Sequence, residues 1–305
     1  MRVVTSIADL RRELDTARAA GRTVGFVPTM GFLHDGHRTL MAAARAECDL
    51  VVVSIFVNPL QFGANEDLAG YPRDLDRDRA ACEAERVDLV LHPAVTEMYP
   101  EPIRTTVTVA GLTERLCGAS RPGHFAGVAT VVAKLCNIVG PCRAYFGKKD
   151  YQQVAVVRRM VADLSVPVEI IARPTVREDD GLAMSSRNTY LDDAARRDAL
   201  ALARALVDAV DAVRGGQHER ALVEAGLRAA LRAAPGVALD YAEVLRGADL
   251  VPTATIEVGE EYVLAVAARI GAARLIDNVT LTVGTGGAVD ADLGVLRDGR
   301  PYSGS

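Results

Sequence analysis

The sequence has no long apolar run. Across its 305 residues, no hydrophobic stretch reaches the roughly 18 residues that a membrane-spanning helix requires. Residues 1–14 also lack the basic-then-apolar pattern of a targeting segment. We therefore expect no membrane partner and a cytoplasmic location.

Cysteine is sparse, and its spacing carries no motif. The five cysteines occur at positions 48, 82, 117, 136 and 142, without a C-x-x-C pair. An odd number of scattered cysteines is typical of reduced thiols in the cytosol rather than of a disulfide framework. The same spacing disfavours a zinc site.

An excess of positive charge is also missing. The chain has 35 Lys and Arg against 40 Asp and Glu, a formal net charge of −5. This balance argues against a nucleic-acid partner bound through bulk charge. Arginine greatly outnumbers lysine, which makes Lys134 and the pair Lys148-Lys149 stand out.

The first glycine-rich turn lacks both common phosphate-loop patterns, G-x-G-x-x-G and G-x-x-x-x-G-K-[ST]. It nevertheless joins an apolar run at 23–27, which predicts a strand, to a helical pattern at 38–46. His34 and His37 lie where this helix begins, and their spacing places both on one face. Helix N–H groups and the positive end of the helix dipole favour anions there. The turn could therefore hold a polyphosphate, although a metal pair or two surface histidines are alternative interpretations.

No activated nucleophile is evident in the sequence. The adjacent serines Ser185 and Ser186 lack a G-x-S-x-G elbow, and no cysteine neighbours a histidine, so we expect no covalent catalysis. The candidate catalytic residues are instead donors and cations: His34, His37, Lys149, Ser185, Ser186 and Arg187. Such a set suits the stabilisation of negative charge at a phosphorus centre. A carboxylate substrate, ionised at neutral pH, could supply the nucleophile without a general base.

Strand and helix patterns alternate through the first half of the chain. Strands are predicted at 50–57, 88–92, 105–109, 143–146 and 168–172. Beyond about residue 190 come Ala- and Arg-rich helices and three strand patterns, at 240–245, 262–268 and 274–282. We predict an α/β fold with a Rossmann-like parallel sheet in an N-terminal domain (1–178) and a smaller α+β C-terminal domain (179–285). The Gly- and Asp-rich residues 286–305 are predicted to be a disordered tail.

The loop at 58–72 follows a predicted parallel strand, at the edge where open α/β sheets bind ligands. Gln61 lies in it, and a side-chain amide can donate to a carboxylate and accept from a hydroxyl. An ordinary solvent-facing glutamine is the alternative. His124, beside a glycine before a helix, could be a ligand contact or a capping residue.

Five blocks in a fixed order resemble the pantothenate synthetase (pantoate–β-alanine ligase) family, within the nucleotidyltransferase superfamily and its H-x-G-H signature. The blocks are Pro28-Thr29-Met30-Gly31 with His34-Asp35-Gly36-His37; 56–63; 121–130; 145–153; and Met184-Ser185-Ser186-Arg187-Asn188. H-x-G-H alone is a weak signal, whereas five ordered blocks are a specific one. The resemblance covers roughly residues 1–285.

The resemblance implies a ligase in which pantoate attacks the α-phosphorus of ATP, and β-alanine then attacks the resulting pantoyl-adenylate. Pantothenate, AMP and pyrophosphate would be the products. It implies that ATP is bound by Met30, Gly31, Phe32, Leu33, His34, Asp35, Gly36, His37, Gly147, Lys148, Lys149, Asp150, Val176, Met184, Ser185, Ser186 and Arg187. It also implies His37 as proton donor and Lys149 on the phosphates, with Lys148 left as a solvated charge. Gln61 and Gln153 would bind pantoate, and the protein would be a homodimer.

One departure concerns magnesium. Some relatives carry adjacent acidic residues and a glutamine after Tyr-Pro-Arg, whereas this chain has Asp76-Arg77-Asp78 and Ala81. We therefore expect Mg²⁺ to be held mainly by ATP oxygens and water, with no protein ligand assigned. A cytidylyltransferase-like enzyme and a catalytically silent nucleotide-binding protein are the alternative functions.

Overall fold

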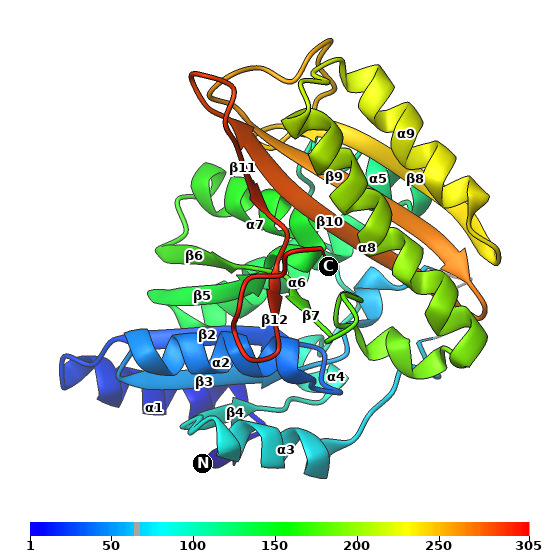
Figure 1. Ribbon diagram of the computed structural model, residues 1–305. Helices are drawn as coiled ribbons and strands as arrows, with labels where there is room; N and C mark the ends of the chain where they lie inside the picture. The colour runs from blue at the N-terminus through cyan, green and yellow to red at the C-terminus, as the bar shows by residue number, and fades with distance from the viewer. Residues whose placement is uncertain (64–67, 305) are drawn as a thin grey trace. The chain divides into compact units, whose positions relative to one another are not determined.

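The structure, a computed structural model, describes residues 1–63 and 68–304 (Figure 1). It divides into two compact units. The first unit comprises residues 1–113, 121–147 and 156–173. The second unit comprises residues 114–120 and 148–155 and the described chain from Pro174 onward. The chain passes into the second unit for good after Arg173. The amino-acid composition gives no sign that residues 114–120 and 148–155 also belong to the second unit.

The first unit contains a six-stranded sheet in the order β1-β4-β3-β2-β5-β6. Its strands are β1 (Arg2–Val4), β2 (Val24–Thr29), β3 (Leu50–Ile55), β4 (Leu89–Leu91), β5 (Cys142–Gly147) and β6 (Val168–Arg173). Every pairing is parallel, which confirms the predicted Rossmann-like sheet. The chain runs outward from β2 to β4 and then continues on the other side of β2 with β5. The strand order therefore reverses between β2 and β5.

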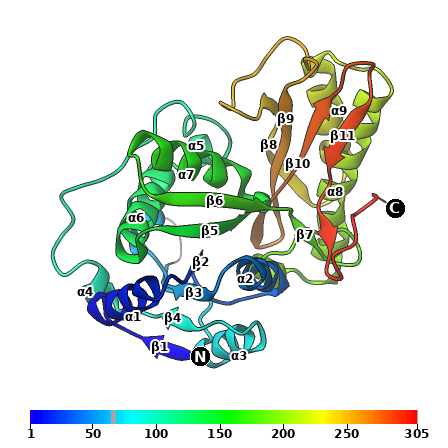
Figure 2. The same ribbon diagram turned by 90° about the vertical axis from the view of Figure 1, so that its left-hand side faces the viewer.

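Helices flank the sheet of the first unit (Figure 2). They are α1 (Ile7–Ala19), α2 (Asp35–Glu47), α3 (Leu75–Ala84), α4 (Val95–Met98) and α6 (His124–Val139), with the 3-10 turn η1 (Pro59–Gln61). Helix α1 packs against α6, and α2 packs against α3 (Figure 2). Leu40, Met41 and Ala44 of α2 are buried against the β-branched residues of β3. A continuous apolar strand such as β3 is typical of a parallel sheet covered on both faces.

The second unit is built on an antiparallel sheet in the order β11-β10-β9-β8. Its strands are β8 (Val237–Arg246), β9 (Glu261–Ile270), β10 (Ala273–Val283) and β11 (Val289–Asp292). Helices α8 (Asp193–Arg214) and α9 (Arg220–Ala233) supply a large apolar core with β8–β10. The unit also includes α5 (Leu116–Ser120), η2 (Lys148–Asp150), the start of α7 (Tyr151–Asp163) and η3 (Ser186–Tyr190).

Two sequence-based predictions are wrong. Residues 105–109 form no strand, and the Val107 N–H donates to the Thr130 hydroxyl at 2.9 Å instead of to a neighbouring strand. Within the predicted disordered tail, β11 pairs with β10, and β12 (Val295–Leu296) pairs with β7 (Val176–Arg177). The glycines of this segment are turn residues: Gly286 and Gly287 have φ of 107° and 85° in the β10–β11 hairpin.

None of the helices in the described parts of the chain is long and apolar enough to cross a membrane. All five cysteines are free thiols, four of them buried. Burial raises the pKa of the Cys82 thiol to about 12 and that of Cys136 to about 11. These thiols are therefore protonated core side chains at neutral pH rather than nucleophiles.

Candidate active site

The carboxyl ends of β2 and β5 define the candidate site of the first unit. In an open parallel sheet, ligands bind outside the carboxyl ends of the strands where the strand order reverses. Met30 follows directly after β2, and Gly147 is the last residue of β5. These are two of the predicted ATP-binding residues, and the parallel pairing of β2 with β5 brings them to this edge of the sheet.

The turn between β2 and α2 has an unusual backbone. Gly31 and Phe32 both adopt positive φ, 83° and 51°. The buried Asp78 of α3 holds this turn by accepting from the backbone N–H groups of Phe32 at 2.8 Å and Leu33 at 2.6 Å. A Cβ at Gly31 would lie 2.8 Å from Asp78 Oδ2, so glycine is required for this close approach. Burial raises the pKa of the Asp78 carboxyl, although the two backbone N–H donors oppose that shift.

His34 and His37 lie side by side at the start of α2. His34 is the residue before the first helical turn, and the centroids of the two imidazoles are 4.1 Å apart. The backbone N–H of His34 donates to Nδ1 of His37 at 3.3 Å. In a neutral imidazole an acceptor at Nδ1 leaves the proton on Nε2. His37 therefore presents an N–H donor at Nε2, beside the positive end of the helix dipole.

Gln61 is buried next to this turn, not solvent-facing. Its Nε2 donates to the sulfur of Met30 at 2.9 Å, and its Oε1 accepts from Asn58 Nδ2 at 3.1 Å. Asn58 also donates to the Gly127 carbonyl and accepts from the Tyr99 hydroxyl at 2.9 Å. The amide of Gln61 is thus held in one orientation, close to the candidate ATP-binding turn.

The backbone of Gln61 is fixed by α6. His124 Nδ1 lies 2.9 Å from the Gln61 carbonyl oxygen, and Arg121 Nη1 lies 2.9 Å from His124 Nε2. Guanidinium nitrogens can only donate and a carbonyl can only accept, which makes His124 the neutral Nδ1–H tautomer. The cap position of α6 is Gly123, so His124 is not the predicted capping residue; its ring instead supports the backbone of Gln61. A Cβ at Gly127 would lie 2.1 Å from the Leu60 carbonyl oxygen, so only glycine lets η1 approach α6 this closely.

The remaining candidates belong to the second unit, where η2 carries the two lysines. Lys148 Nζ lies 2.9 Å from Asp292 Oδ2, which corrects the expectation of a solvated charge. Lys149 Nζ is 3.8 Å from Asp150 Oδ1, and its side chain is 17% exposed. The carbonyls of both lysines accept from the amide of Asn278. The turn therefore separates the two ammonium groups and gives them different surroundings.

Val176 and Met184–Arg187 come together within the same unit. The Met184 N–H donates to the Val176 carbonyl at 2.9 Å, and Arg177 and Ala183 form an antiparallel bridge. Ser185 caps η3 by accepting from the Arg187 N–H at 3.3 Å. The two serines and Arg187 are half-buried at the start of this turn. The predicted adenine and phosphate contacts of this segment thus lie on one compact hairpin.

The two glutamines at the start of α7 differ in their surroundings. Gln152 is buried, and its Nε2 donates to the Arg115 carbonyl at 2.8 Å. Gln153, the predicted pantoate ligand, is half-buried. Gln152 is therefore a structural residue, and the role of Gln153 stays a prediction.

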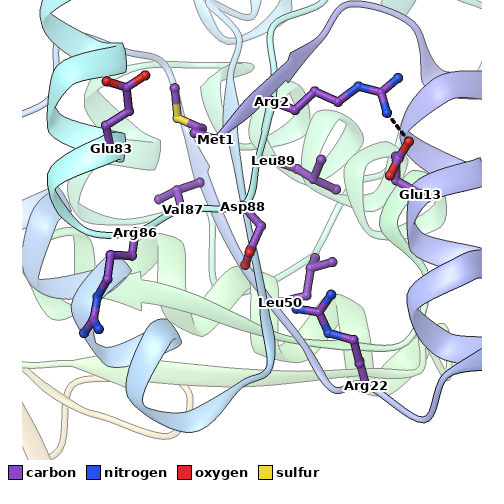
Figure 3. Close-up of a pocket in the computed structure, with 10 residues that line it drawn as sticks. All are labelled: Met1, Arg2, Glu13, Arg22, Leu50, Glu83, Arg86, Val87, Asp88 and Leu89. Atoms are coloured by element: carbon purple, nitrogen blue, oxygen red, sulfur yellow. Dashed lines mark hydrogen bonds and ion pairs between the residues drawn. The ribbon is translucent and has the colours of Figure 1, made fainter.

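A pocket of about 720 Å³ lies elsewhere in the first unit (Figure 3). Leu50 and Leu89, the first residues of β3 and β4, line it, so it marks the amino ends of the strands, opposite the candidate site. Its charged groups are largely engaged: Arg2 pairs with Glu13, and Asp88 accepts from Arg45 at 2.7 Å. Among residues 1–63 and 68–304, no group of three or more His, Cys, Asp or Glu side chains could hold a metal ion.

Three residues that shape these groups were not predicted from the sequence: Asp78, Asn58 and Asn278. Asn58 stands just beyond a buried strand and before Pro59, a position that could have marked it. Asn278 follows Asp277 in the middle of β10, between Ile276 and Val279, which was also a usable signal. Asp78 has no comparable signal because its partners lie 45 and 46 residues away in the chain.

Comparison with known proteins gives these residues a context. Residues 2–280 match the family model described as pantoate-beta-alanine ligase. The pantothenate synthetases of Moorella thermoacetica and Agrobacterium fabrum are 52% and 53% identical over 283 and 278 residues. These alignments cover 93% and 91% of this chain and 99% and 95% of those proteins.

Solved structures agree with the sequence matches. The pantothenate synthetase of Thermus thermophilus aligns with a TM-score of 0.85 and 50% identity, over 91% of this chain and 98% of that one. The pantoate-beta-alanine ligase of Francisella tularensis, complexed with beta-gamma ATP and beta-alanine, aligns with a TM-score of 0.72 and 32% identity. That alignment covers 91% of this chain and 97% of the other. The similarity extends over both compact units.

Proposed function

Because this chain belongs to the pantoate–beta-alanine ligase family, it condenses pantoate with β-alanine, and we propose that it does so in two steps driven by ATP. In the first step, a pantoate carboxylate oxygen bonds to the α-phosphorus of ATP, and pyrophosphate leaves. In the second step, the neutral amine of β-alanine bonds to the acyl carbon of the adenylate, the bond from that carbon to the AMP oxygen breaks, and AMP and one amine proton leave. The Francisella tularensis relative, complexed with beta-gamma ATP and beta-alanine, supports both ligands.

The observation that carries the proposal is the turn between β2 and α2. Its backbone is fixed by Asp78, and it presents the Nε2–H of His37 beside His34 at a helix N-terminus. Fixed donors lower the barrier where negative charge develops, and one such donor is worth about 3 kcal/mol. We propose that His37 donates to the phosphates, where the nucleophile and the leaving group are both anionic.

The second unit supplies the other proposed contacts. Lys149 and Arg187 would neutralise the phosphate oxygens, Ser185 and Ser186 would donate to them, and Val176 would contact adenine. In the first unit, hydrogen bonds to Asn58 and Met30 fix the amide of Gln61, and we assign this amide to pantoate. We assign Gln153 to pantoate as well. These roles rest on the family motifs that the residues occupy.

We propose that Mg²⁺ arrives with ATP, bound by phosphate oxygens and water. The candidate residues around the phosphates are imidazoles, an ammonium, a guanidinium and hydroxyls, which suit phosphate oxygens better than a hard dication. We further propose a homodimer and a cytoplasmic location, supported by the family resemblance and by the free thiols. Sedimentation analysis of the purified chain tests the dimer.

The experiment for the proposed mechanism is pyrophosphate release from Mg-ATP at enzyme concentrations high enough to resolve a single turnover. With pantoate alone, we expect a burst close to one pyrophosphate per active site. Adding β-alanine should convert the burst into continuous release. Release that requires β-alanine from the first turnover would exclude the separate adenylate step, and release without pantoate would exclude pantoate as the nucleophile.

A further inference from the structure

Asn278 of β10 clamps the turn that carries Lys149. Its Nδ2 donates to the carbonyl oxygens of Lys148 at 3.0 Å and Lys149 at 2.7 Å. The side chain is almost fully buried, with 6% exposure for the residue. Two hydrogen bonds from one buried amide to consecutive carbonyls fix the direction of the backbone in η2. They thereby set the point from which the Lys149 side chain leaves the chain.

The clamp is itself anchored by a buried ion pair. The Asn278 N–H donates to Asp277 Oδ1 at 2.7 Å, and Asp277 accepts from both terminal nitrogens of Arg177 at 2.6 and 3.0 Å. The side chains of Arg177 and Asp277 are only 1% and 2% exposed. A bidentate guanidinium–carboxylate pair is directional, and burial removes the competing water. Asn278 therefore extends from a rigid base.

The ammonium groups of Lys148 and Lys149 in this turn have different partners. The Lys148 ammonium is bound by Asp292, on the strand next to β10. The carboxylate of the adjacent Asp150 lies 3.8 Å from Lys149 Nζ, beyond the 2.7–2.9 Å of a charge-assisted hydrogen bond. With Lys148 engaged and both carbonyls clamped, Lys149 is the lysine of this turn that is better placed to meet a phosphate.

We infer that Asn278 is a positioning residue for Lys149: its clamp on the η2 carbonyls directs the Lys149 ammonium toward the polyphosphate of ATP. The inference deepens the proposed function and rests on it, because that function gives Lys149 its phosphate contact. Misplacing a group by about 1 Å can cost roughly 100-fold in rate. Loss of the clamp should therefore reduce the rate through Lys149 even though Asn278 touches no substrate.

The test is a double-mutant cycle between Asn278→Ala and Lys149→Ala, measured as single-turnover pyrophosphate release with pantoate. We expect Asn278→Ala to lower kcat/KM for ATP by roughly tenfold or more in the natural background. In the Lys149→Ala background the same change should have less than a roughly twofold effect. Asn137→Ala, which also removes an amide bonded to a backbone carbonyl, serves as the matched control and should leave the rate unchanged.

Equal losses from Asn278→Ala in both backgrounds would overturn the inference, because Asn278 would then act independently of Lys149. No loss in the natural background would overturn it too. If Lys149→Ala alone kept full activity, the proposed phosphate role of Lys149 would fail instead. A severe Lys149→Ala defect with an additive Asn278→Ala defect would leave the proposed function intact and remove only the positioning role.

Asn278→Asp keeps the shape of the side chain and guards against a variant that fails to fold. As a carboxylate it would face two carbonyl acceptors, whereas its protonated form can donate one hydrogen bond. Its activity relative to the natural enzyme should therefore rise as the pH is lowered from about 8.5 to about 6, with circular dichroism checking the fold at each pH. A ratio that does not change with pH would contradict the clamp.

Discussion

The carboxylate of Asp78 accepts a hydrogen bond from the backbone N–H of Phe32 at 2.8 Å and holds that residue in the left-handed region, at φ 51°. A non-glycine residue in this region is strained and persists where its surroundings fix it. Here the surroundings are a buried carboxylate on α3 and, above the Phe32 ring, the Arg77 guanidinium at 4.7 Å. The geometry of the turn between β2 and α2 therefore depends on α3, and not on α2, the helix that follows the turn.

Replacing Asp78 by Asn tests this dependence. The amide has one acceptor oxygen where the carboxylate offers two, so either Phe32 or Leu33 loses its partner, and we expect a loss of about 1–3 kcal/mol in stability. Because burial raises the pKa of the Asp78 carboxyl, the folded state binds more protons than the unfolded state between the two pKa values. The stability that this protonation contributes to the folded state is fully present below the unfolded pKa near 3.8. It is lost as the pH rises through the pKa of the folded state.

The gap in Tm between the natural chain and Asp78→Asn should therefore narrow as the pH rises from about 4 to about 7. Thermal unfolding followed by circular dichroism at a series of pH values measures it. A gap that widens over this interval would mean that the backbone donors outweigh burial and lower the pKa in the folded state.

His37→Ala should lower pyrophosphate release with pantoate by more than roughly tenfold while the protein stays folded. The substitution removes the Nε2–H donor. The His34 N–H also loses its acceptor, which costs about 1 kcal/mol of stability. Single-turnover release and Tm give the two quantities. His218→Ala, at a histidine outside every candidate group, is the control. Full activity, or an unfolded variant, would remove the role assigned to His37.

Gln61→Ala should raise KM for pantoate much more than KM for ATP. Its amide is fixed by Asn58 and Met30, and a buried amide that binds a carboxylate and a hydroxyl contributes on the order of 1–3 kcal/mol, roughly 10- to 100-fold in KM. Initial rates with each substrate varied in turn separate the two constants. The loop variant Gln217→Ala should change neither. Equal increases for both substrates would argue against a pantoate contact.

Local sequence patterns predicted most of the helices and strands, but they did not predict the contacts between residues far apart in the chain. The apolar runs of β2 and β3 and the glycines after β2 predicted the strand–turn–helix unit because their signal lies within a few residues. The prediction of a strand at 105–109 was wrong because the Val107 N–H donates to the hydroxyl of Thr130 on α6, and not to a neighbouring strand. The bonds of Asn278 to Lys148 and Lys149 span 130 and 129 residues, which no local pattern reports.

In the candidate site, too, the residues with a proposed chemical role were predicted from the sequence, whereas the residues that position them were not. His34, His37 and Lys149 follow from motif and spacing, since their chemistry is visible in the residue type. The residues that hold them in place are ordinary in sequence. In the sequence, Asp78 is one of several charged residues on a charged helix. Only the structure shows that it is buried and accepts from two backbone N–H groups.

Two helical glycines offer a matched test of how closely η1 must approach α6. At Gly127 a Cβ would lie 2.1 Å from the Leu60 carbonyl oxygen and 2.7 Å from the Gln61 nitrogen, so Gly127→Ala must displace the backbone that carries Gln61. Overpacking of this kind costs about 1–3 kcal/mol. At Gly226 in α9 a Cβ meets nothing within 4 Å, and Gly226→Ala should stabilise the protein by about 0.5–1 kcal/mol.

Chemical denaturation and steady-state kinetics of the two variants complete the comparison. Gly127→Ala should lower the free energy of unfolding and raise KM for pantoate, because Gln61 moves with η1. Gly226→Ala should raise the free energy of unfolding and leave both KM values unchanged. If Gly127→Ala lost stability but kept the natural KM for pantoate, the position of η1 would matter for packing alone, and Gln61 would not be the pantoate ligand that its fixed amide indicates.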